Sequence, residues 1–282
     1  MTVLVVGNAT VDRTHRVPHL PRAGETLLAI ATRTEPGGKG LNQAVTAARA
    51  GAAVRFVAGI GDDPDAALIR AFLEAEGLAS GLVSGPGESD RSTILVDLAG
   101  ENLIVSTAGQ ALALPAAVAR AALGGLRAGD ALLVQGNLDR TLTLELVRAA
   151  RAAGIRTLAN AAPLAWDWAP LLPLLDLLVV NEVEARALDP RAVPVVVRTL
   201  GERGAELTAE GRSRLVPAPR VAPVDTTGAG DVVCGMLAAG LDLGLDHETA
   251  LRAAVTAAAL KVQRPGTASG LPSAAALRGL LR

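Results

Sequence analysis

The segment at residues 225–231 combines small residues with two carboxylates and carries the strongest chemical signal in the chain. It reads Asp-Thr-Thr-Gly-Ala-Gly-Asp and precedes an apolar stretch of helical character at 232–241. Small residues ahead of a helix let several backbone N–H groups converge on an anion. A carboxylate at Asp231, in the first helical turn, would lie beside that anion and could accept a proton from an attacking hydroxyl. The segment suits phosphoryl transfer, and the alternative is an Asp that only caps a helix.

A second glycine-rich turn, at residues 35–44, carries Lys39, one of only two lysines in the chain. Three of the four positions from 37 to 40 are glycine, which allows the backbone to approach a ligand closely. The turn is not a Walker A loop, because the four-residue spacer is absent and no Ser or Thr follows Lys39. The alternative is a tight turn with an exposed lysine, but the rarity of lysine in this chain favours a site.

Composition excludes several classes of protein. With 282 residues, 50% of them hydrophobic, the chain makes one large domain or two small ones. A formal charge of -1 predicts binding neither to nucleic acid nor to anionic lipid. The single cysteine, Cys234, and three histidines exclude a disulfide scaffold or a zinc finger. No apolar stretch approaches the ~20 residues of a membrane span, and no positively charged segment precedes the first apolar run, so we expect a cytoplasmic protein.

Short apolar runs alternate with Ala- and Leu-rich stretches of helical period along most of the chain. This alternation predicts an α/β fold with a doubly wound, mainly parallel sheet sandwiched by helices, and ligands at the carboxyl ends of the strands. The expected strands are 3–6, 54–60, 131–135, 155–159 and 177–180, and the expected helices are 40–50, 65–76 and 141–153.

Two stretches, 13–34 and 91–107, interrupt this alternation. Both contain alternating, Thr-rich sequence with no helical segment, which is typical of an antiparallel flap added to the main sheet. We expect them to form a small β lid over the site. No linker or charge block divides the chain, so the simplest organisation is a single domain over residues 1–282 with this lid.

The two glycine-rich motifs, at 37–44 and 225–231, resemble the two signatures of the ribokinase-like PfkB carbohydrate kinases and occur in the family's order. The likeness covers nearly the whole chain, with further matching motifs at 7–12, 59–63, 181–184 and 199–204. It implies a ribokinase-like fold and ATP-dependent phosphorylation of a primary hydroxyl on a sugar, with ribose or a related sugar as the best match.

The resemblance also implies roles for particular residues at the site of transfer. Asp231 matches the catalytic base, beside an anion hole formed by Gly228, Ala229 and Gly230. The positions that match the sugar-binding residues are Asp12, Gly38, Lys39 and Asn42. A carboxylate and an amide suit vicinal hydroxyls, which need both acceptors and donors.

On the nucleotide side, Asn181 and Glu184 match a pair that organises Mg²⁺ and the phosphates, largely through water. Thr199, Gly201 and Gly204 match the segment that flanks ATP. The alternatives are structural: a strand-end cap for Asn181, a first-turn helix acid for Glu184, and turn glycines for the other two.

Many relatives bind K⁺ beside the anion hole through backbone carbonyls, and the resemblance implies the same here. The matching ligands are Asp225, Thr227 and, in the C-terminal loop 261–270, Gly266. Two features depart from the family: Gly270 occupies a position where relatives often have Ser, and Lys261 brings a cation close in sequence.

Other departures concern the substrate and the nucleotide side. Ribokinases have a Glu after the strand that ends in Gln, whereas this chain reads Gln-Gly-Asn at 135–137, so a sugar-contacting carboxylate is missing. The interval 185–198 is too short for the helix and strand usual there, so we expect one peripheral helix to be lost.

Two other functions stay open: a nucleoside kinase of the same fold, and a non-catalytic sugar-binding sensor. The scarcity of aromatic residues favours a bare sugar over a nucleoside. The intact Asp231 and anion-hole glycines argue against a sensor.

The resemblance further implies an assembly, because relatives often pair their lids. A small flap exposes an apolar face and unpaired strand edges. We therefore expect a homodimer through the lid, and the alternative is a monomer whose lid folds onto its own domain. The candidates for the buried face are Ile30, Ile94, Val96 and Ile104.

Overall fold

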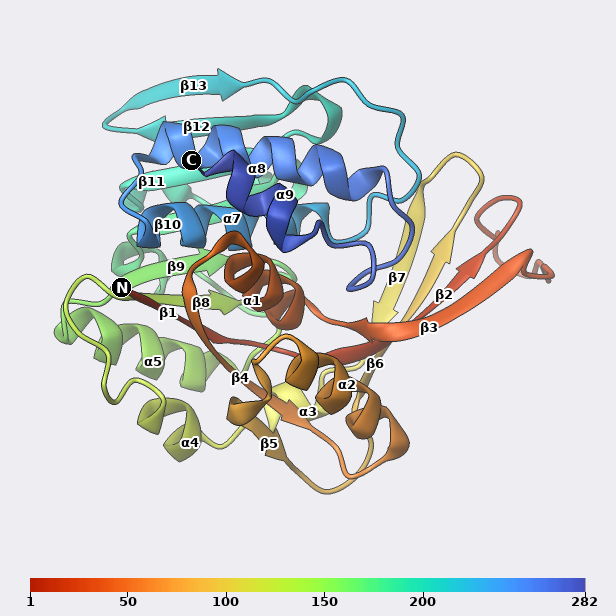
Figure 1. The fold of residues 1–282 in the computed structure, drawn as a ribbon, viewed down its shortest axis with the longest axis horizontal. Helices are drawn as coiled ribbons and strands as arrows, with labels where there is room; N and C mark the ends of the chain where they lie inside the picture. The colour runs from red at the N-terminus through yellow and green to blue at the C-terminus, as the bar shows by residue number, and fades with distance from the viewer. Residues whose placement is uncertain (282) are drawn as a thin grey trace.

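The computed structural model describes residues 1–281 of the chain, which fold into two β-sheets and flanking helices (Figure 1). The larger sheet has nine strands in the order β13-β12-β11-β10-β9-β8-β1-β4-β5. Neighbours from β11 to β5 run parallel, whereas β12 and β13 are antiparallel additions at one edge. The strands are β1 (Thr2–Val6), β4 (Ala53–Ile60), β5 (Leu82–Ser84), β8 (Ala131–Gln135), β9 (Arg156–Asn160), β10 (Leu177–Asn181), β11 (Val195–Thr199), β12 (Ala205–Ala209) and β13 (Arg212–Val216).

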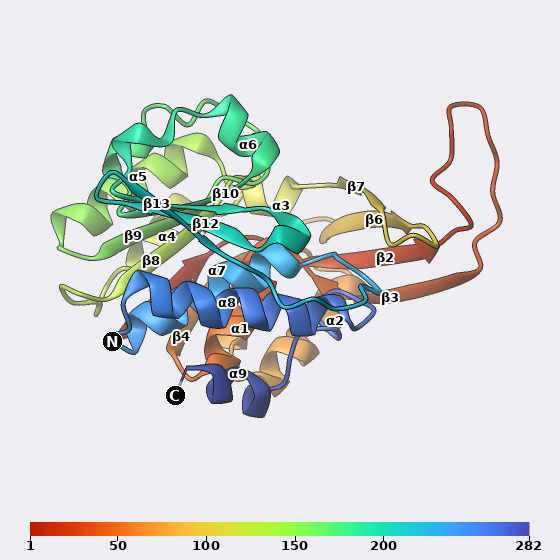
Figure 2. The same ribbon diagram turned by 90° about the horizontal axis from the view of Figure 1, so that it is seen from above.

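Helices cover both faces of this sheet (Figure 2). The first face carries the larger core and is covered by α1 (Lys39–Ala50), α2 (Pro64–Ala75), α7 (Ala229–Asp242), α8 (His247–Val262) and α9 (Ala274–Leu280). The opposite face is covered by α4 (Ala116–Ala121), α5 (Arg140–Ala152) and α6 (Glu182–Ala187), and the short α3 (Gly109–Leu112) lies beside β4. From β1 the chain continues to β4 on one side, and β8 later pairs with β1 on the other side. The carboxyl ends of β1 and β8 therefore lie at the position where doubly wound folds bind ligands.

Local sequence determines where the helices begin. Asp63 caps α2 by accepting a hydrogen bond from the N–H of Ala66, and Pro64 takes the first helical position, where no N–H is needed. Asp139 caps α5 in the same way through the N–H of Leu142. The expected strands and helices match the observed ones to within two residues at each end, because apolar periodicity and capping act locally.

The smaller sheet has the order β3-β2-β6-β7 and projects from the carboxyl edge of the large one (Figure 1). Its strands are β2 (Thr10–Arg16), β3 (Ala31–Gly37), β6 (Asp90–Val96) and β7 (Asn102–Ser106). The outer pairs are antiparallel as expected, but the central pair, β2 and β6, is parallel. The expectation of a wholly antiparallel flap is therefore wrong, because α1, β4, α2 and β5 form a crossover between the central strands and return the chain in its original direction.

Pairing register determines which side chains of the small sheet face the rest of the molecule. Asp12 pairs with Ser92, so Ile94 and Val96 share the face of Asp12. Their side chains are only 1% and 6% exposed within the single chain. The expectation that they form a dimer face is wrong, because strand alternation turns them inward.

Ile30 and Ile104 are 57% and 46% exposed. Ile104 pairs with Ile94 and therefore also lies on the inner face. The exposed apolar side chains of the outer face on β7 are Leu103 and Val105, which are 51% and 68% exposed.

The interval between Glu184 and Thr199 holds more structure than its length suggested. It contains the second half of α6, which has six residues, and nearly all of β11. A helix and a strand therefore fit, because the helix already begins at Glu182. Among residues 1–281, none of the helices is both long and apolar enough to span a bilayer.

Candidate active site

Asp231 lies in the first turn of α7, directly after the turn that the sequence predicts to be an anion site. Gly228, the residue before the helix, has φ 78°, a left-handed conformation that favours glycine. The Asp231 side chain is 6% exposed. Its Oδ2 accepts a hydrogen bond of 3.1 Å from Nδ2 of Asn42, and its Oδ1 accepts one of 3.1 Å from Nε2 of Gln43. Two amides therefore fix the carboxylate from both sides.

The first turn of α1 provides both of these amides. Gly38 precedes the helix with φ 101°, and a Cβ on it would lie 3.0 Å from the carbonyl oxygen of Asn8. The side chain of Asn8 accepts a hydrogen bond from the N–H of Gly40 at 3.1 Å. These contacts hold the start of α1 against the loop after β1, at the carboxyl edge of the large sheet.

A series of hydrogen-bonded side-chain amides extends from Asp231 to the carboxyl ends of two strands of the large sheet. Nε2 of Gln43 also lies 3.4 Å from Oδ1 of Asn160, and Nε2 of Gln135 donates to Oε1 of Gln43 at 2.8 Å. Gln135 and Asn160 are the last residues of the adjacent strands β8 and β9. Gln43 lies within the glycine-rich motif at 35–44, but the sequence does not predict its contact with Asp231, because the two residues are 188 positions apart.

Asp12, on β2, is 3% exposed and accepts a hydrogen bond of 2.7 Å from the hydroxyl of Thr10. Burial raises its pKa above the ordinary 3.8, while hydrogen bonds from Thr10, Ser92 and Thr267 act in the opposite direction. A side chain at Gly37 on β3 would clash with the Asp12 carboxylate. The glycine at position 37 therefore leaves room for the Asp12 carboxylate.

Several buried acceptors near these residues have no hydrogen-bond partner. Among the described residues they include Oδ1 of Asn42, Oε1 of Gln135 and Oδ1 of Asn137. Buried polar atoms are normally paired, so unpaired acceptors at one sheet edge point to a ligand that donates hydrogen bonds. Sugar hydroxyls have that chemistry.

Asn181 and Glu184 form a reciprocal capping box at the start of α6. Oδ1 of Asn181 accepts from the N–H of Glu184 at 2.8 Å, and Oε2 of Glu184 accepts from the N–H of Asn181 at 2.8 Å. A further bond of 2.9 Å joins Nδ2 of Asn181 to Oε1 of Glu184. The pair therefore caps α6, and Glu184 lies buried beside a cavity.

That cavity, of about 100 Å³, lies between Asp231, Asn181 and Glu184. Lys39, Gly228 and Gly230 also line it, so its walls combine a cation, two carboxylates and the start of α7. Lys39 is half-buried. The N–H of Ala229 donates a long hydrogen bond of 3.3 Å to the carbonyl of Thr226 within the turn.

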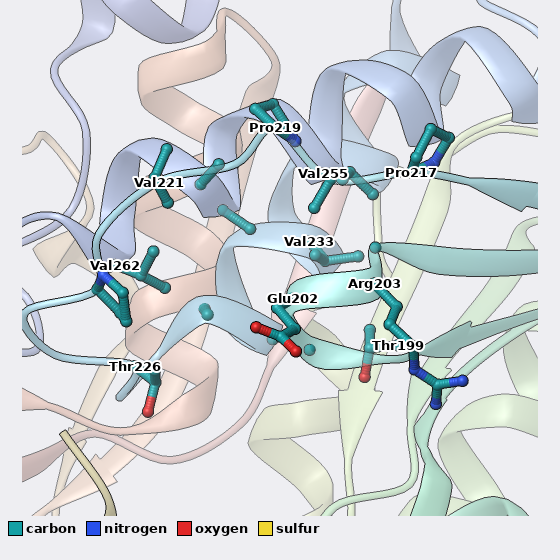
Figure 3. A pocket seen from close by; sticks show the side chains of 18 of the residues that line it. Thr199, Glu202, Arg203, Pro217, Pro219, Val221, Thr226, Val233, Val255 and Val262 are labelled. Carbon is teal, nitrogen blue, oxygen red and sulfur yellow. The ribbon is translucent and has the colours of Figure 1, made fainter. Parts of the chain in front are cut away.

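A larger cleft of about 1110 Å³ adjoins the small cavity and shares Asn181, Thr199 and Gly230 with it (Figure 3). Gly201 and Gly204, at the turn between β11 and β12, line one side. The opposite wall is apolar and is built from Pro217, Pro219, Val221, Val233, Val255 and Val262. The cleft has room for a ligand of nucleotide size.

Asp225 joins the turn before α7 to the C-terminal loop. Its Oδ1 accepts from the N–H of Thr227 at 2.9 Å, and its Oδ2 accepts from the N–H of Gly266 at 2.8 Å. The three residues expected to bind K⁺ therefore lie together. Nζ of Lys261 donates to the backbone oxygen of Asp225 at 3.2 Å and to that of Arg264 at 3.4 Å.

Glu35, on β3, ties the same C-terminal loop to the small sheet. Its carboxylate accepts hydrogen bonds of 3.0 Å from the N–H groups of Thr267 and Ser269. It is 6% exposed. From the small sheet, Asn102 on β7 also reaches the turn before α7, at 3.4 Å from the hydroxyls of Thr226 and Thr227.

Comparison with known proteins places the chain in a family. Residues 2–274 match the pfkB family carbohydrate kinases. The chain is 33% identical to the ribokinase of Bacillus subtilis (strain 168), covering 96% of each protein, and 31% identical to the deoxyribokinase of Salmonella typhi, covering 97% of this chain and 96% of that one. A solved structure of Arabidopsis thaliana ribokinase, complexed with ribose and ATP, superposes with a TM-score of 0.84 at 26% identity, covering all of this chain and 98% of that one.

The chain belongs to the PfkB family of carbohydrate kinases. It is accordingly a phosphotransferase that acts on a sugar hydroxyl with ATP as donor, and the expected ribokinase-like fold is confirmed.

Proposed function

We propose that the protein transfers the γ-phosphate of ATP to the primary hydroxyl of ribose or a closely related sugar. The observation that carries this proposal is the Asp231 carboxylate, held by two amides at the start of α7 beside a cavity that opens into a cleft of nucleotide size. Two relatives that cover 96% or more of this chain are named as a ribokinase and a deoxyribokinase, which supports a pentose here.

In the proposed mechanism Asp231 accepts the proton of the sugar hydroxyl as that hydroxyl attacks the γ-phosphate. The N–H groups at the start of α7, on Gly228, Ala229 and Gly230, stabilise the negative charge of the moving phosphoryl group. Lys39 lines the small cavity from the other side and adds a positive charge there.

Asp12 and Asn42 would bind the sugar, with Gly38 beside them. The unpaired Oδ1 of Asn42 accepts one hydroxyl, and its Nδ2 remains on Asp231. Asn137, with an unpaired buried oxygen, lies in the Gln-Gly-Asn segment that lacks the Glu of ribokinases. An amide can both donate to and accept from a sugar, so its presence is compatible with a pentose.

The nucleotide would occupy the larger cleft, with its phosphates toward the small cavity. Thr199, Gly201 and Gly204 line the cleft, and the apolar wall suits the face of a purine. The cell's ATP pool is in the cytoplasm, which is the location we propose for the protein.

Mg²⁺ fits this arrangement as a companion of the phosphates. Within residues 1–281 no three His, Cys, Asp or Glu side chains form a metal cluster, so the chain supplies no complete cage. Mg²⁺ commonly keeps several waters and uses one or two carboxylates plus phosphate oxygens. Glu184 and Asn181 would hold it through water, and the ion would neutralise charge on the phosphates. K⁺ fits less well, because an ammonium already lies on the Asp225 carbonyl.

We also propose that the small sheet acts as a lid. Its inner face carries Asp12, and Asn102 contacts the turn before α7, so the sheet spans from the sugar to the phosphate end of the site. Exclusion of water suppresses ATP hydrolysis, the competing reaction.

A homodimer through the outer face of this lid is the assembly we propose. The edge strand β7 presents Leu103 and Val105, and a second copy of the chain would cover both the apolar side chains and the edge. Light scattering tests the assembly, and Val105→Asp should shift it toward monomer. A wild-type mass of 28.5 kDa, that of one chain, would contradict the dimer.

A substrate panel tests the activity. Purified protein with MgATP is offered ribose, deoxyribose, other pentoses, hexoses and ribonucleosides, and ADP release and phosphorylated product are both measured. We expect the highest kcat/KM on a pentose. A preference for ribonucleosides would favour the nucleoside-kinase alternative, and sugar binding without product in any reaction would favour the sensor.

A further inference from the structure

Lys261 is an unusual residue in this chain because it is a completely buried lysine. It lies at the C-terminal end of α8 and has no exposed surface. Its ammonium donates to two backbone carbonyls, at 3.2 Å on Asp225 and 3.4 Å on Arg264. Removing an ammonium from water is costly, so a lysine is rarely fully buried without compensating partners.

The surroundings of Lys261 provide that compensation. Burial lowers its pKa, whereas the carboxylates of Asp225, Glu35 and Asp231 oppose this effect. A Cβ on Gly228 would lie 3.8 Å from Cε of Lys261. The end of the Lys261 side chain therefore lies against the turn whose Gly228 and Gly230 line the small cavity.

Gly270 gives the lysine its room. A Cβ at that position would lie 3.2 Å from Cε of Lys261, 3.1 Å from the oxygen of Pro265 and 2.5 Å from the oxygen of Gly266. A serine there would press against both the lysine and the loop. The two departures from the family, a lysine at 261 and a glycine at 270, thus lie in contact, and the carbonyl oxygen of Gly266 also leaves no room for a larger residue at 270.

We propose that the Lys261 ammonium is the resident monovalent cation behind the anion site, so that the protein needs no K⁺. A metal cation on the Asp225 carbonyl would be repelled by the ammonium already bonded to it. The inference rests on the proposed kinase function but concerns a separate property of the site.

Lys261 acts in this proposal as a positioning residue. By holding the Asp225 carbonyl it fixes the turn at 226–228, and its positive charge lies on the side where the phosphoryl group gains negative charge. Because it is attached to the chain, the cation is present whatever salt surrounds the protein.

The first test uses the wild-type protein. Its kcat and its unfolding temperature are measured in KCl and in choline chloride at equal ionic strength, the second without substrates. We expect both to be the same in the two salts. A several-fold activation by K⁺, or an unfolding temperature raised by K⁺ and not by choline, would overturn the proposal.

The second test uses three variants that separate charge from space. Lys261→Met keeps the volume without the charge and should lower kcat about 10- to 100-fold, with little change in sugar KM and no rescue by K⁺. Lys261→Ala removes the ammonium and vacates its space, so K⁺ should raise both its kcat and its unfolding temperature. Gly270→Ala alone should destabilise the protein in either salt.

A Lys261→Met variant with wild-type kcat would also overturn the proposal. If Lys261→Ala does not fold, the wild-type measurements still decide the question. If no sugar is phosphorylated by any sample, the kinase assignment fails, whereas the unfolding temperatures continue to report whether K⁺ binds.

Discussion

Nε2 of Gln43 lies 3.1 Å from Oδ1 of Asp231, although the two residues are 188 positions apart in the chain. The contact joins the first turn of α1 to the first turn of α7, and Asn42 makes the matching contact with the other carboxylate oxygen. Both amides that donate hydrogen bonds to the Asp231 carboxylate belong to α1 and not to α7. The position of α1 therefore determines the orientation of the carboxylate.

Gln43→Leu should therefore lower kcat about 10- to 100-fold, since a hydrogen bond to a charged group is worth about 1.5–3 kcal/mol. The sugar KM should change much less. Steady-state kinetics with saturating ATP measures both. Thr46→Ala, one turn further along the same buried face of α1, is the matched control and should keep nearly full activity. Wild-type kcat in Gln43→Leu would show that Asn42 alone orients the carboxylate.

Asp231→Asn should lower kcat by about two to four orders of magnitude, the usual effect of losing a general base, and leave the fold intact. Circular dichroism of the same sample checks the fold. The same exchange at Asp242, the last residue of α7, is the control and should leave the rate nearly unchanged. A loss smaller than about tenfold would remove Asp231 from the role of base.

Asp12→Ala should weaken sugar binding at least about tenfold, because an unpartnered buried hydroxyl costs about 1–3 kcal/mol. ATP binding should stay near the wild-type value, since the nucleotide cleft lies on the other side of Asp231. Isothermal titration calorimetry measures the two ligands separately. An unchanged sugar Kd would mean that Asp12 has a structural role only.

Asp12 should also make stability depend on pH. Burial raises its pKa above 3.8, so the ionised form is the less favourable one in the folded state. The stability it contributes is present below the unfolded-state pKa and is lost as pH rises through the raised value. Asp12→Asn escapes this loss, so its unfolding temperature relative to wild type should increase as the pH rises above 3.8. A difference that stays constant or falls over this range contradicts the expectation.

Glu35→Ala should destabilise the protein by about 1–3 kcal/mol for each backbone N–H left without a partner, those of Thr267 and Ser269. Urea denaturation measures the free energy of unfolding. Thr34→Ala, an exposed neighbour on the same strand, should have little effect. Equal stability of the two variants would show that water replaces Glu35 on both N–H groups.

Much of the fold could be predicted from the sequence because its signals are local. Apolar runs such as 131–135 coincide with strands, and Asp63 with Pro64 marks the start of α2 within three residues of chain. The glycine motifs predicted the anion turn and the start of α1 for the same reason. The backbone at Gly228 and Gly38 has a positive φ, which favours glycine and is therefore visible in the sequence.

What could not be predicted depends on which distant segments meet. The parallel pairing of β2 with β6 follows from the crossover between them, and it turned Ile94 inward. Likewise, the burial of Lys261 depends on Gly270 and on the Asp225 carbonyl, and no periodicity in α8 signals that its last turn carries a buried charge.

The bond between Glu35 and Thr267 has a consequence for how the molecule is made. The two residues are 232 positions apart, so β3 is synthesised long before the loop that completes its contacts. A nascent chain on the ribosome could form the early βα units and still lack this closure until the loop at 264–270 emerges. Catalytic competence should therefore arrive only once the loop at 264–270 has emerged, and shorter nascent chains would hold the sugar side of the site in an unfinished form.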